Sequence, residues 1–198
     1  TLRCFVAVPV NGGVREQIAA WRNQIRKLLP NAKWVHPDHY HLTLKFYGEL
    51  AQSTVEKLAE ALRAALSAYG TFEIELGGLG AFPDLQRPRV LWVGVRRGAE
   101  HLRELAGIVE AASVGLELPA ERDDYHPHLT LARFRVPIQA KDLAPDLLLA
   151  NELSWGPFTV ETAHLISSRL TPRGPIYTNL YAFPLGGIAS QVPIDGTP

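Results

Sequence analysis

One tetrapeptide occurs twice in this 198-residue chain and constrains its fold more than any other feature. The first motif, His41-Leu42-Thr43-Leu44, and the second motif, His128-Leu129-Thr130-Leu131, are identical and lie 87 positions apart (128 − 41 = 87). This separation is about half of the chain, which is typical of an internal duplication rather than of a short structural repeat. The sequence therefore indicates two related halves, each with one copy of the motif.

Both motifs lie in segments whose pattern predicts β-strands, residues 40–47 and 127–135. Side chains two positions apart on a strand point to the same face. Each motif therefore turns a histidine and a threonine hydroxyl to one side and two leucines to the other. The leucines can anchor the strand in a core while the polar pair faces a cleft. If the halves face each other by pseudo-twofold symmetry, the cleft holds two imidazoles and two hydroxyls in opposed pairs.

Strand-like and helix-like apolar spacing alternate along the rest of the chain. Further strands are predicted at residues 4–10, 72–76, 90–95, 159–167 and 176–183, and helices at residues 14–28, 53–66, 102–112 and 139–150. Ser53-Thr54-Val55-Glu56 has the pattern of a capping box that opens the second helix. This order of elements predicts an α+β protein with helices packed on mostly antiparallel sheets.

Paired histidines and threonines suit displacement at phosphorus. Histidine has the unperturbed pKa nearest neutrality, so one imidazole can deprotonate an attacking water while the opposed imidazolium protonates the leaving oxygen. Threonine hydroxyls can donate hydrogen bonds to the non-bridging oxygens, where negative charge develops. A strained cyclic phosphodiester is a natural substrate, because its leaving oxygen stays on the product. We therefore predict a phosphoesterase that requires no metal or other cofactor.

Composition excludes several other classes of function. The formal net charge is zero and the pI is about 7.0, so anion binding has to come from local clusters of basic residues. Cys4 is the only cysteine, which excludes an internal disulfide framework and favours a reducing, cytoplasmic setting. No apolar stretch is long enough to cross a membrane. Gly77-Gly78-Leu79-Gly80 lacks the Walker pattern and is interpreted as a turn that ends a strand, so ATP dependence is not indicated.

The sequence resembles the two-histidine phosphoesterase superfamily, and within it the RNA 2′,3′-cyclic phosphodiesterases, also called 2′-5′ RNA ligases. The two motifs carry this resemblance, and further segments extend it in the same order as far as about Phe183. These segments are Arg3-Cys4-Phe5-Val6-Ala7-Val8, Trp34-Val35, Tyr40 to Phe46, Pro88-Arg89-Val90-Leu91-Trp92-Val93-Gly94, His126 to Arg133, Ser168-Arg169-Leu170 and Gly174-Pro175-Ile176-Tyr177.

The resemblance implies a bilobal α+β fold, with two pseudo-symmetric lobes of mostly antiparallel sheet, helices packed outside and a central active-site cleft. Residues 1–185 would form this single domain, and residues 186–198 a poorly ordered tail. The implied activity is hydrolysis of RNA 2′,3′-cyclic phosphate ends to 2′-phosphates, with reversible 2′-5′ joining as a further implied reaction. The implied partner is RNA with such an end, or a small cyclic nucleotide, and a monomer is expected.

The resemblance also implies individual roles. His41 would be the proton donor and His128 the proton acceptor, although two identical motifs do not themselves distinguish acid from base. Thr43 and Thr130 would bind the phosphate. Arg133 would also contact it, since a guanidinium suits phosphate geometry. Arg133 is, however, five residues after His128, which is the opposite face of a regular strand, so it needs a bulge, a strand end or a long reach.

Four residues close to the motifs have more than one interpretation. Lys45 has the same parity as His41, so it either faces the site or is a solvated charge at an edge. Tyr40, Phe46 and Tyr125 could stack on a terminal base, but aromatic residues in strands are more often part of a core, and we expect core positions.

Two rival hypotheses remain open on the sequence. His36, His39 and His41 lie close together, and His126 and His128 share a strand face, so a zinc-dependent hydrolase is one alternative. Pro37 and Pro127 argue against it, because they indicate turns that direct the flanking histidines elsewhere. The other alternative is a non-catalytic module that binds a nucleotide or an RNA end, and the presence of both motif histidines argues against this.

Overall fold

The computed structural model describes residues 1–136, 138, 152–172 and 174–186, and in these residues all strands join one sheet. The order across the sheet is β7-β4-β5-β6-β3-β1-β8-β9, and the short β2 pairs with β6. Every pairing between these strands is antiparallel. The bounds are β1 Leu2–Pro9, β2 Ala32–Trp34, β3 His41–Leu50, β4 Phe72–Phe82, β5 Val90–Arg97, β6 Leu129–Phe134, β7 Ser154–Val160, β8 Thr162–Thr171 and β9 Gly174–Pro184.

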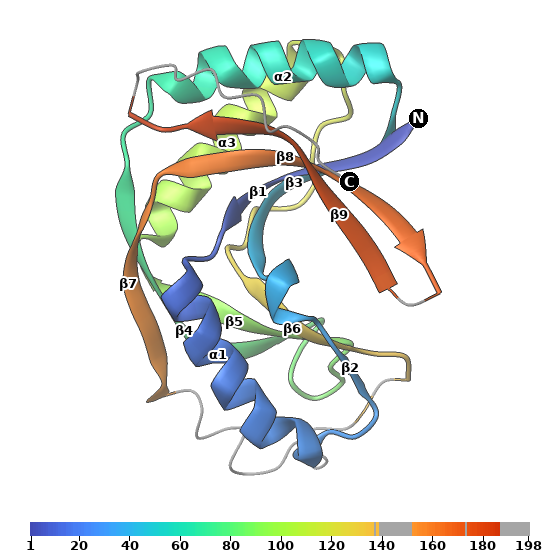
Figure 1. The fold of residues 1–198 in the computed structure, drawn as a ribbon, viewed down its shortest axis with the longest axis vertical. Helices are drawn as coiled ribbons and strands as arrows, with labels where there is room; N and C mark the ends of the chain where they lie inside the picture. Colours follow the sequence, from blue (N-terminus) through green and yellow to red (C-terminus); the bar gives the residue numbers. More distant parts are fainter. Residues whose placement is uncertain (137, 139–151, 173, 187–198) are drawn as a thin grey trace.

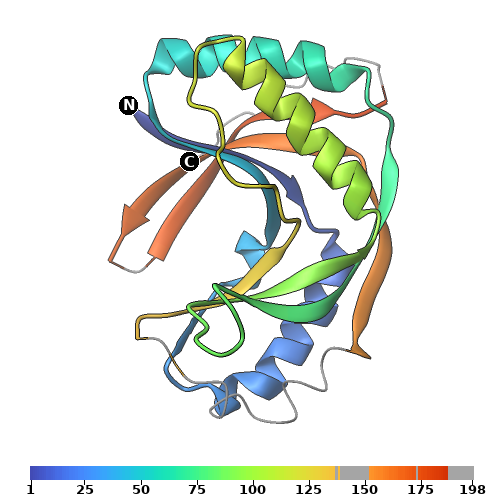
Figure 2. The ribbon, with the colours of Figure 1, turned by 180° about the vertical axis from the view of Figure 1, so that it is seen from behind.

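The sheet curls into an open half-barrel whose two halves meet where β3 lies beside β6 (Figures 1 and 2). One half has the order β3-β1-β8-β9 and the other the order β6-β5-β4-β7. The strands that carry the two motifs are therefore neighbours at the centre of one continuous sheet. This arrangement confirms the predicted α+β class with antiparallel sheet, and it puts the two histidine motifs at the junction between the halves.

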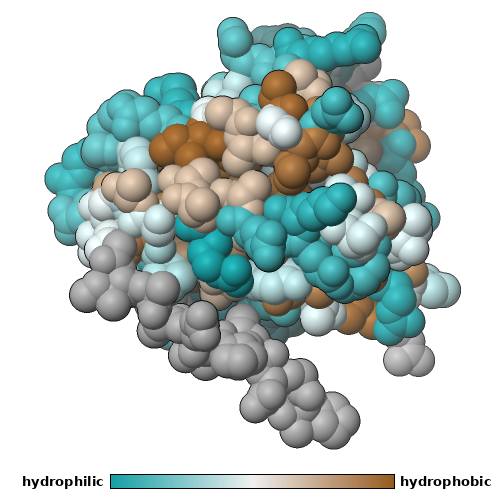
Figure 3. Space-filling model, turned by 90° about the horizontal axis from the view of Figure 1, so that it is seen from above, coloured by the Kyte–Doolittle hydropathy of each residue, from teal (hydrophilic) through white to brown (hydrophobic). Residues whose placement is uncertain are grey.

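The three α-helices of the described residues pack against different parts of the sheet. α1 (Gly12–Ile25) packs against β7, whereas α2 (Gln52–Ser67) and α3 (Ala99–Val114) pack on each other and against β9 and β3 (Figure 1). The apolar positions of α2 are buried as their helical spacing predicts: Val55, Leu58, Leu62 and Leu66 are at most 1% exposed. Figure 3 shows the molecule from the side of α2, where a band of apolar side chains is surrounded by hydrophilic residues.

The start of α2 corrects the capping-box prediction. The helix begins at Gln52, and the residue before it is Ala51, which has no side chain able to cap. Ser53 and Thr54 lie inside the first turn, where the backbone N–H of Thr54 donates to the carbonyl of Ala51. Backbone geometry alone therefore starts this helix. A side-chain cap is present at α1 instead, where Asn11 accepts a hydrogen bond from the Gly13 N–H.

Two strand predictions were also wrong. The segment Gly77-Gly78-Leu79-Gly80 does not end β4 but continues it, with an irregularity between Leu76 and Leu79 where the pairing with β5 slips. The predicted strand at residues 159–167 is two strands, because β7 ends at Val160 and β8 begins at Thr162. The predicted helix at residues 139–150 and the predicted tail, apart from Gly186, lie outside the described residues.

None of the helices in the described ranges is long and apolar enough to cross a membrane.

Candidate active site

The two motifs meet through one pair of strand residues. Leu42 of β3 is opposite Leu129 of β6, and both leucines are fully buried. In an antiparallel register the neighbours of this pair face each other crosswise, so His41 stands across from Thr130 and Thr43 across from His128. All four side chains line a cleft of about 730 Å³. The crosswise arrangement gives each histidine the threonine of the other motif as its neighbour across the junction.

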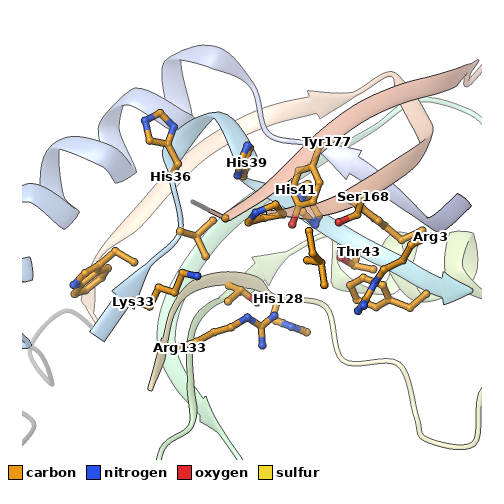
Figure 4. Close-up of a pocket in the computed structure, with 18 of the residues that line it drawn as sticks. Arg3, Lys33, His36, His39, His41, Thr43, His128, Arg133, Ser168 and Tyr177 are labelled. Atoms are coloured by element: carbon orange, nitrogen blue, oxygen red, sulfur yellow. The ribbon is translucent and has the colours of Figure 1, made fainter. Parts of the chain in front are cut away.

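The two catalytic candidates lie on opposite walls of this cleft. In Figure 4, His41 lies with Tyr177 on one wall, while His128 lies with Arg133 on the other. A substrate phosphorus between the walls would have one imidazole on each side of it. An in-line displacement requires an acid and a base on opposite sides of the phosphorus, because the nucleophile enters opposite the leaving oxygen.

Each histidine is oriented by a hydrogen bond to the residue two positions before it. The Nδ1–H of His128 donates to the backbone carbonyl of His126 at 2.7 Å, and His41 hydrogen-bonds the backbone of His39. A neutral imidazole with its proton on Nδ1 keeps Nε2 free to accept a proton. Both histidines therefore have a backbone partner two positions before them, and this feature does not by itself distinguish acid from base.

Burial favours the neutral form of both imidazoles. Desolvation lowers the pKa of His41 from its usual 6.5 to about 4, and the nearby His39, His128 and Arg133 lower it further, against the opposing effect of its backbone hydrogen bond. Desolvation likewise lowers the pKa of His128, with contributions from His126 and Arg133. A bound phosphodiester anion favours the imidazolium form, so substrate would raise both pKa values.

Aromatic rings fix the position of each imidazole. The ring of His41 lies 4.9 Å from that of Phe5 and 5.5 Å from that of Tyr177. The ring of His128 lies 4.9 Å from Phe82 in an edge-on arrangement and 6.1 Å from Trp92. Such contacts hold a ring in one orientation.

Gly80 makes the support of His128 possible. A Cβ atom added at Gly80 would overlap the ring of Trp92, so only glycine lets this indole lie flat on β4. Trp92 in turn contacts the ring of His126 at 4.8 Å and that of His128. The glycine within β4 therefore supports the second motif from behind.

A bulge in β6 brings Arg133 into the cleft. Thr130 pairs with Trp92 and Ala132 pairs with Leu91, so Leu131 is an extra residue without a partner on β5. The extra residue reverses the alternation of side chains beyond it. Arg133 consequently faces the same side as Thr130 and lines the cleft. Of the three possibilities that the sequence left open for Arg133, the structure has the bulge.

The first motif has the equivalent bulge, and it corrects the expectations for two residues. Leu44 is the extra residue between the pairs of β3 with β1. Beyond it, Lys45 turns away from the cleft and is only 5% exposed, with its ammonium group donating to the Glu110 carboxylate and to the Pro119 carbonyl. Lys45 is neither a site residue nor a solvated charge. Phe46, expected in the core, is instead 56% exposed and lines the cleft.

The other aromatic predictions hold. Tyr40 is 5% exposed and belongs to the main core cluster, and Tyr125 packs against the same cluster. Both are therefore core residues.

The other histidines near the motifs do not converge on a common point. The Nδ1 atom of His36 lies 3.4 Å from the Asp38 carboxylate, the ring of His39 contacts Tyr177 at 4.6 Å, and His126 lies against Trp92. Within the described residues, no three His, Cys, Asp or Glu side chains are grouped so that they could hold a metal ion.

The cleft is cationic although the chain is neutral. Its charged lining residues in the described part of the chain are Arg3, Lys33 and Arg133, with no carboxylate among them. Lys33 was not identified from the sequence. A signal was available in the pattern Leu129-x-Leu131-Ala132, where two adjacent apolar residues break the alternation and indicate a bulge. That bulge turns Arg133 towards the cleft, and the regular register of β6 with β2 puts Lys33 opposite it.

Comparisons with known proteins relate this chain to one family. The sequence profile of the 2'-5' RNA ligase superfamily matches residues 5–171. An RNA 2',3'-cyclic phosphodiesterase of Aeropyrum pernix is 36% identical over 83% of this chain and 93% of its own. Another, of Methanothermobacter thermautotrophicus, is 32% identical over 93% and 99%. The crystal structure of TT0787 of Thermus thermophilus has a TM-score of 0.77 at 29% identity, covering 94% of this chain and 99% of that one.

Proposed function

The chain belongs to the 2'-5' RNA ligase superfamily, and on this premise we propose that it hydrolyses RNA 2′,3′-cyclic phosphate ends to 2′-phosphomonoesters through His41 and His128. The observation that carries the proposal is the crosswise placement of the two motifs on opposite walls of a cationic cleft. A phosphodiester anion has matching charge, and its cyclic form keeps the leaving oxygen attached.

The mechanism divides the proton transfers between the two walls. His128, with its proton on Nδ1, accepts a proton from water at Nε2 while the water attacks phosphorus. The bond from phosphorus to the 3′ oxygen breaks, and His41 in its imidazolium form protonates that oxygen. This leaves the phosphate on the 2′ oxygen. The donor role of His41 rests on the resemblance of the chain to the family, because both histidines have a backbone hydrogen-bond partner two positions before them.

Three further residues would hold the phosphate during this step. The hydroxyls of Thr43 and Thr130 would donate to non-bridging oxygens, and the Arg133 guanidinium would neutralise their charge. These donors are fixed on strands before substrate binds. Preorganised donors lose no energy to reorientation as the negative charge grows.

The same arrangement would accept a 5′-hydroxyl in place of water. Attack by that hydroxyl breaks the same bond to the 3′ oxygen and gives a 2′-5′ phosphodiester, which is the ligation reaction. All the proposed site residues come from one chain, so we also propose that a monomer is sufficient for catalysis.

Product analysis tests the proposal. An RNA oligonucleotide with a 2′,3′-cyclic phosphate end should be converted to a product with a 2′-monophosphate, both in the presence and in the absence of a chelator. Activity that disappears on chelation and returns with zinc would favour the metal-dependent alternative. Binding of this RNA without turnover would favour the non-catalytic module.

A further inference from the structure

The catalytic groups of the cleft are symmetric, but the proposed reaction is not. Each motif offers a histidine, a threonine and a backbone hydrogen-bond partner two positions before the histidine. A cyclic phosphate could therefore bind with either of its two ring oxygens towards His41. Some residue outside the motifs has to decide this orientation if only one monoester is to form.

The symmetry is broken five residues after each histidine. The paired bulges at Leu44 and Leu131 bring the fifth residue of both strands into the cleft, and these residues are Phe46 in one half and Arg133 in the other. A phenyl ring and a guanidinium thus occupy equivalent positions on the two sides of the histidines.

The strand partner of each residue enlarges this contrast. Phe46 is opposite Phe5 in the register of β3 with β1, and their rings are 5.4 Å apart. Arg133 is opposite Lys33 in the register of β6 with β2. The cation on the aromatic half, Arg3, has Glu49 as its register partner. One rim of the cleft therefore carries two aromatic rings and one cation, Arg3, whereas the other carries two adjacent cations.

The ring of Phe46 contacts the buried Phe5 on one side and is otherwise outside the core. Its side chain is 56% exposed, and Leu170 on β8, which also lines the cleft, is 65% exposed. Exposed apolar groups beside a polar reaction centre have a cost in water, which a flat apolar ligand would remove. All nucleobases can stack on such rings, because every base has a flat π-face.

We propose that Phe46 is the stacking platform for the base of the reacting nucleotide, and that its opposition to Lys33 and Arg133 sets the orientation of the cyclic phosphate. With the base held on the Phe46 rim, the phosphate lies towards the cationic rim and one ring oxygen faces His41. This inference rests on the proposed function, and it assigns recognition of the base, which the motifs do not contact, to Phe46.

Two cyclic phosphates that differ only in the base provide the test. The probes are adenosine 2′,3′-cyclic phosphate and the 2,3-cyclic phosphate of 1-deoxyribose, which has the same ring but no base. Wild-type protein should prefer the adenosine compound. Phe46→Ala should lower kcat/KM for that compound by about 10-fold or more, mainly through KM, and leave the base-free compound unchanged. Phe46→Tyr should retain the wild-type preference.

The position of the product phosphate is the second measurement. Wild-type protein should release one monoester, whereas Phe46→Ala should release a mixture of 2′- and 3′-monoesters. Val114→Ala is the matched control, since Val114 is a 51% exposed apolar residue on α3 that does not line the cleft. Phe46→Leu keeps an apolar side chain without a flat ring, and it should behave as Phe46→Ala does.

Several outcomes would overturn the inference. It fails if Phe46→Ala slows both compounds equally or neither of them, or if its product remains a single isomer. It also fails if the wild type hydrolyses the base-free compound as well as the nucleotide. If the wild type opens neither compound nor a cyclic-phosphate RNA end, the proposed function itself is wrong.

Discussion

Leu42 and Leu129 pair across β3 and β6 with both side chains fully buried, and the two motifs are arranged crosswise about this pair. The core therefore holds the site from behind, because each leucine lies between a histidine and a threonine of its own strand. The spacing between the two imidazoles depends on strand pairing and not on a flexible loop. A site built on paired strands can place its proton donors and acceptors before substrate binds.

Removal of either imidazole should remove most of the turnover. We expect His41→Ala and His128→Ala each to lower kcat by about 10²- to 10⁴-fold, because each deletes one proton transfer. Hydrolysis of a 2′,3′-cyclic nucleotide measures this. His101→Ala on α3, where the ring contacts Phe72 at 5.0 Å, is the control and should stay near wild type. Near-normal turnover in either motif variant would contradict the shared mechanism.

The threonine hydroxyls should contribute less than the imidazoles. Thr43→Val and Thr130→Val keep the shape of the side chain but lose the donor, so each should reduce kcat by roughly 100-fold, or about 3 kcal/mol of transition-state stabilisation. Thr43→Ser and Thr130→Ser retain the hydroxyl and should recover most of the activity. If the valine variants lose only substrate affinity, the hydroxyls act in binding and not in the transition state.

The sequence predicted the centre of the site but not its edges. The leucines of each motif are buried and the His-Thr pairs face the cleft, as a period of two requires. The prediction failed one residue beyond the first motif. A bulge adds a residue without changing the local composition, so the faces assigned to Lys45 and Phe46 were reversed.

Pairing between distant strands explains the other differences. Nothing local in the segment at residues 159–167 shows that Glu161 separates two strands, because β7 pairs with β4 while β8 pairs with β1 and β9. The Gly77–Gly80 segment has the composition of a turn, yet its pairing with β5 continues, with Trp92 packed on Gly80. Such long-range contacts override local preference.

Replacement of Lys45 should lower stability but not activity, whereas replacement of Arg133 should lower activity but not stability. Lys45→Met leaves Glu110 without its buried partner, so we expect a loss of about 2 kcal/mol in the free energy of unfolding. Its kcat/KM, measured well below the melting temperature, should change little. Arg133→Met should lower kcat/KM by about 10-fold or more with no loss of stability, since the side chain is exposed in the cleft. Denaturant unfolding and kinetics on the same two variants decide this.

Gly80 should affect catalysis although it lies outside the cleft lining. Gly80→Ala forces the Trp92 ring off β4, and this ring supports both His126 and His128. We expect a reduced kcat and a change in the chemical shifts of the His128 ring. Gly107→Ala on α3, where a Cβ atom meets nothing within 4 Å, is the matched control. An unchanged His128 signal in Gly80→Ala would show that Trp92 does not position this histidine.

The pH dependence should differ between free enzyme and enzyme–substrate complex. Burial lowers the pKa of His41 to about 4 and also lowers that of His128, so both pKa values in the free enzyme lie below 6.5. One histidine has to carry a proton and the other has to be neutral, so kcat/KM should form a bell whose maximum lies between these two values. It should therefore fall as the pH rises through 6.5. The bound phosphodiester anion favours imidazolium, which moves the profile of kcat to higher pH. Coincident profiles of kcat and kcat/KM would mean that the substrate does not restore a proton to the donor histidine.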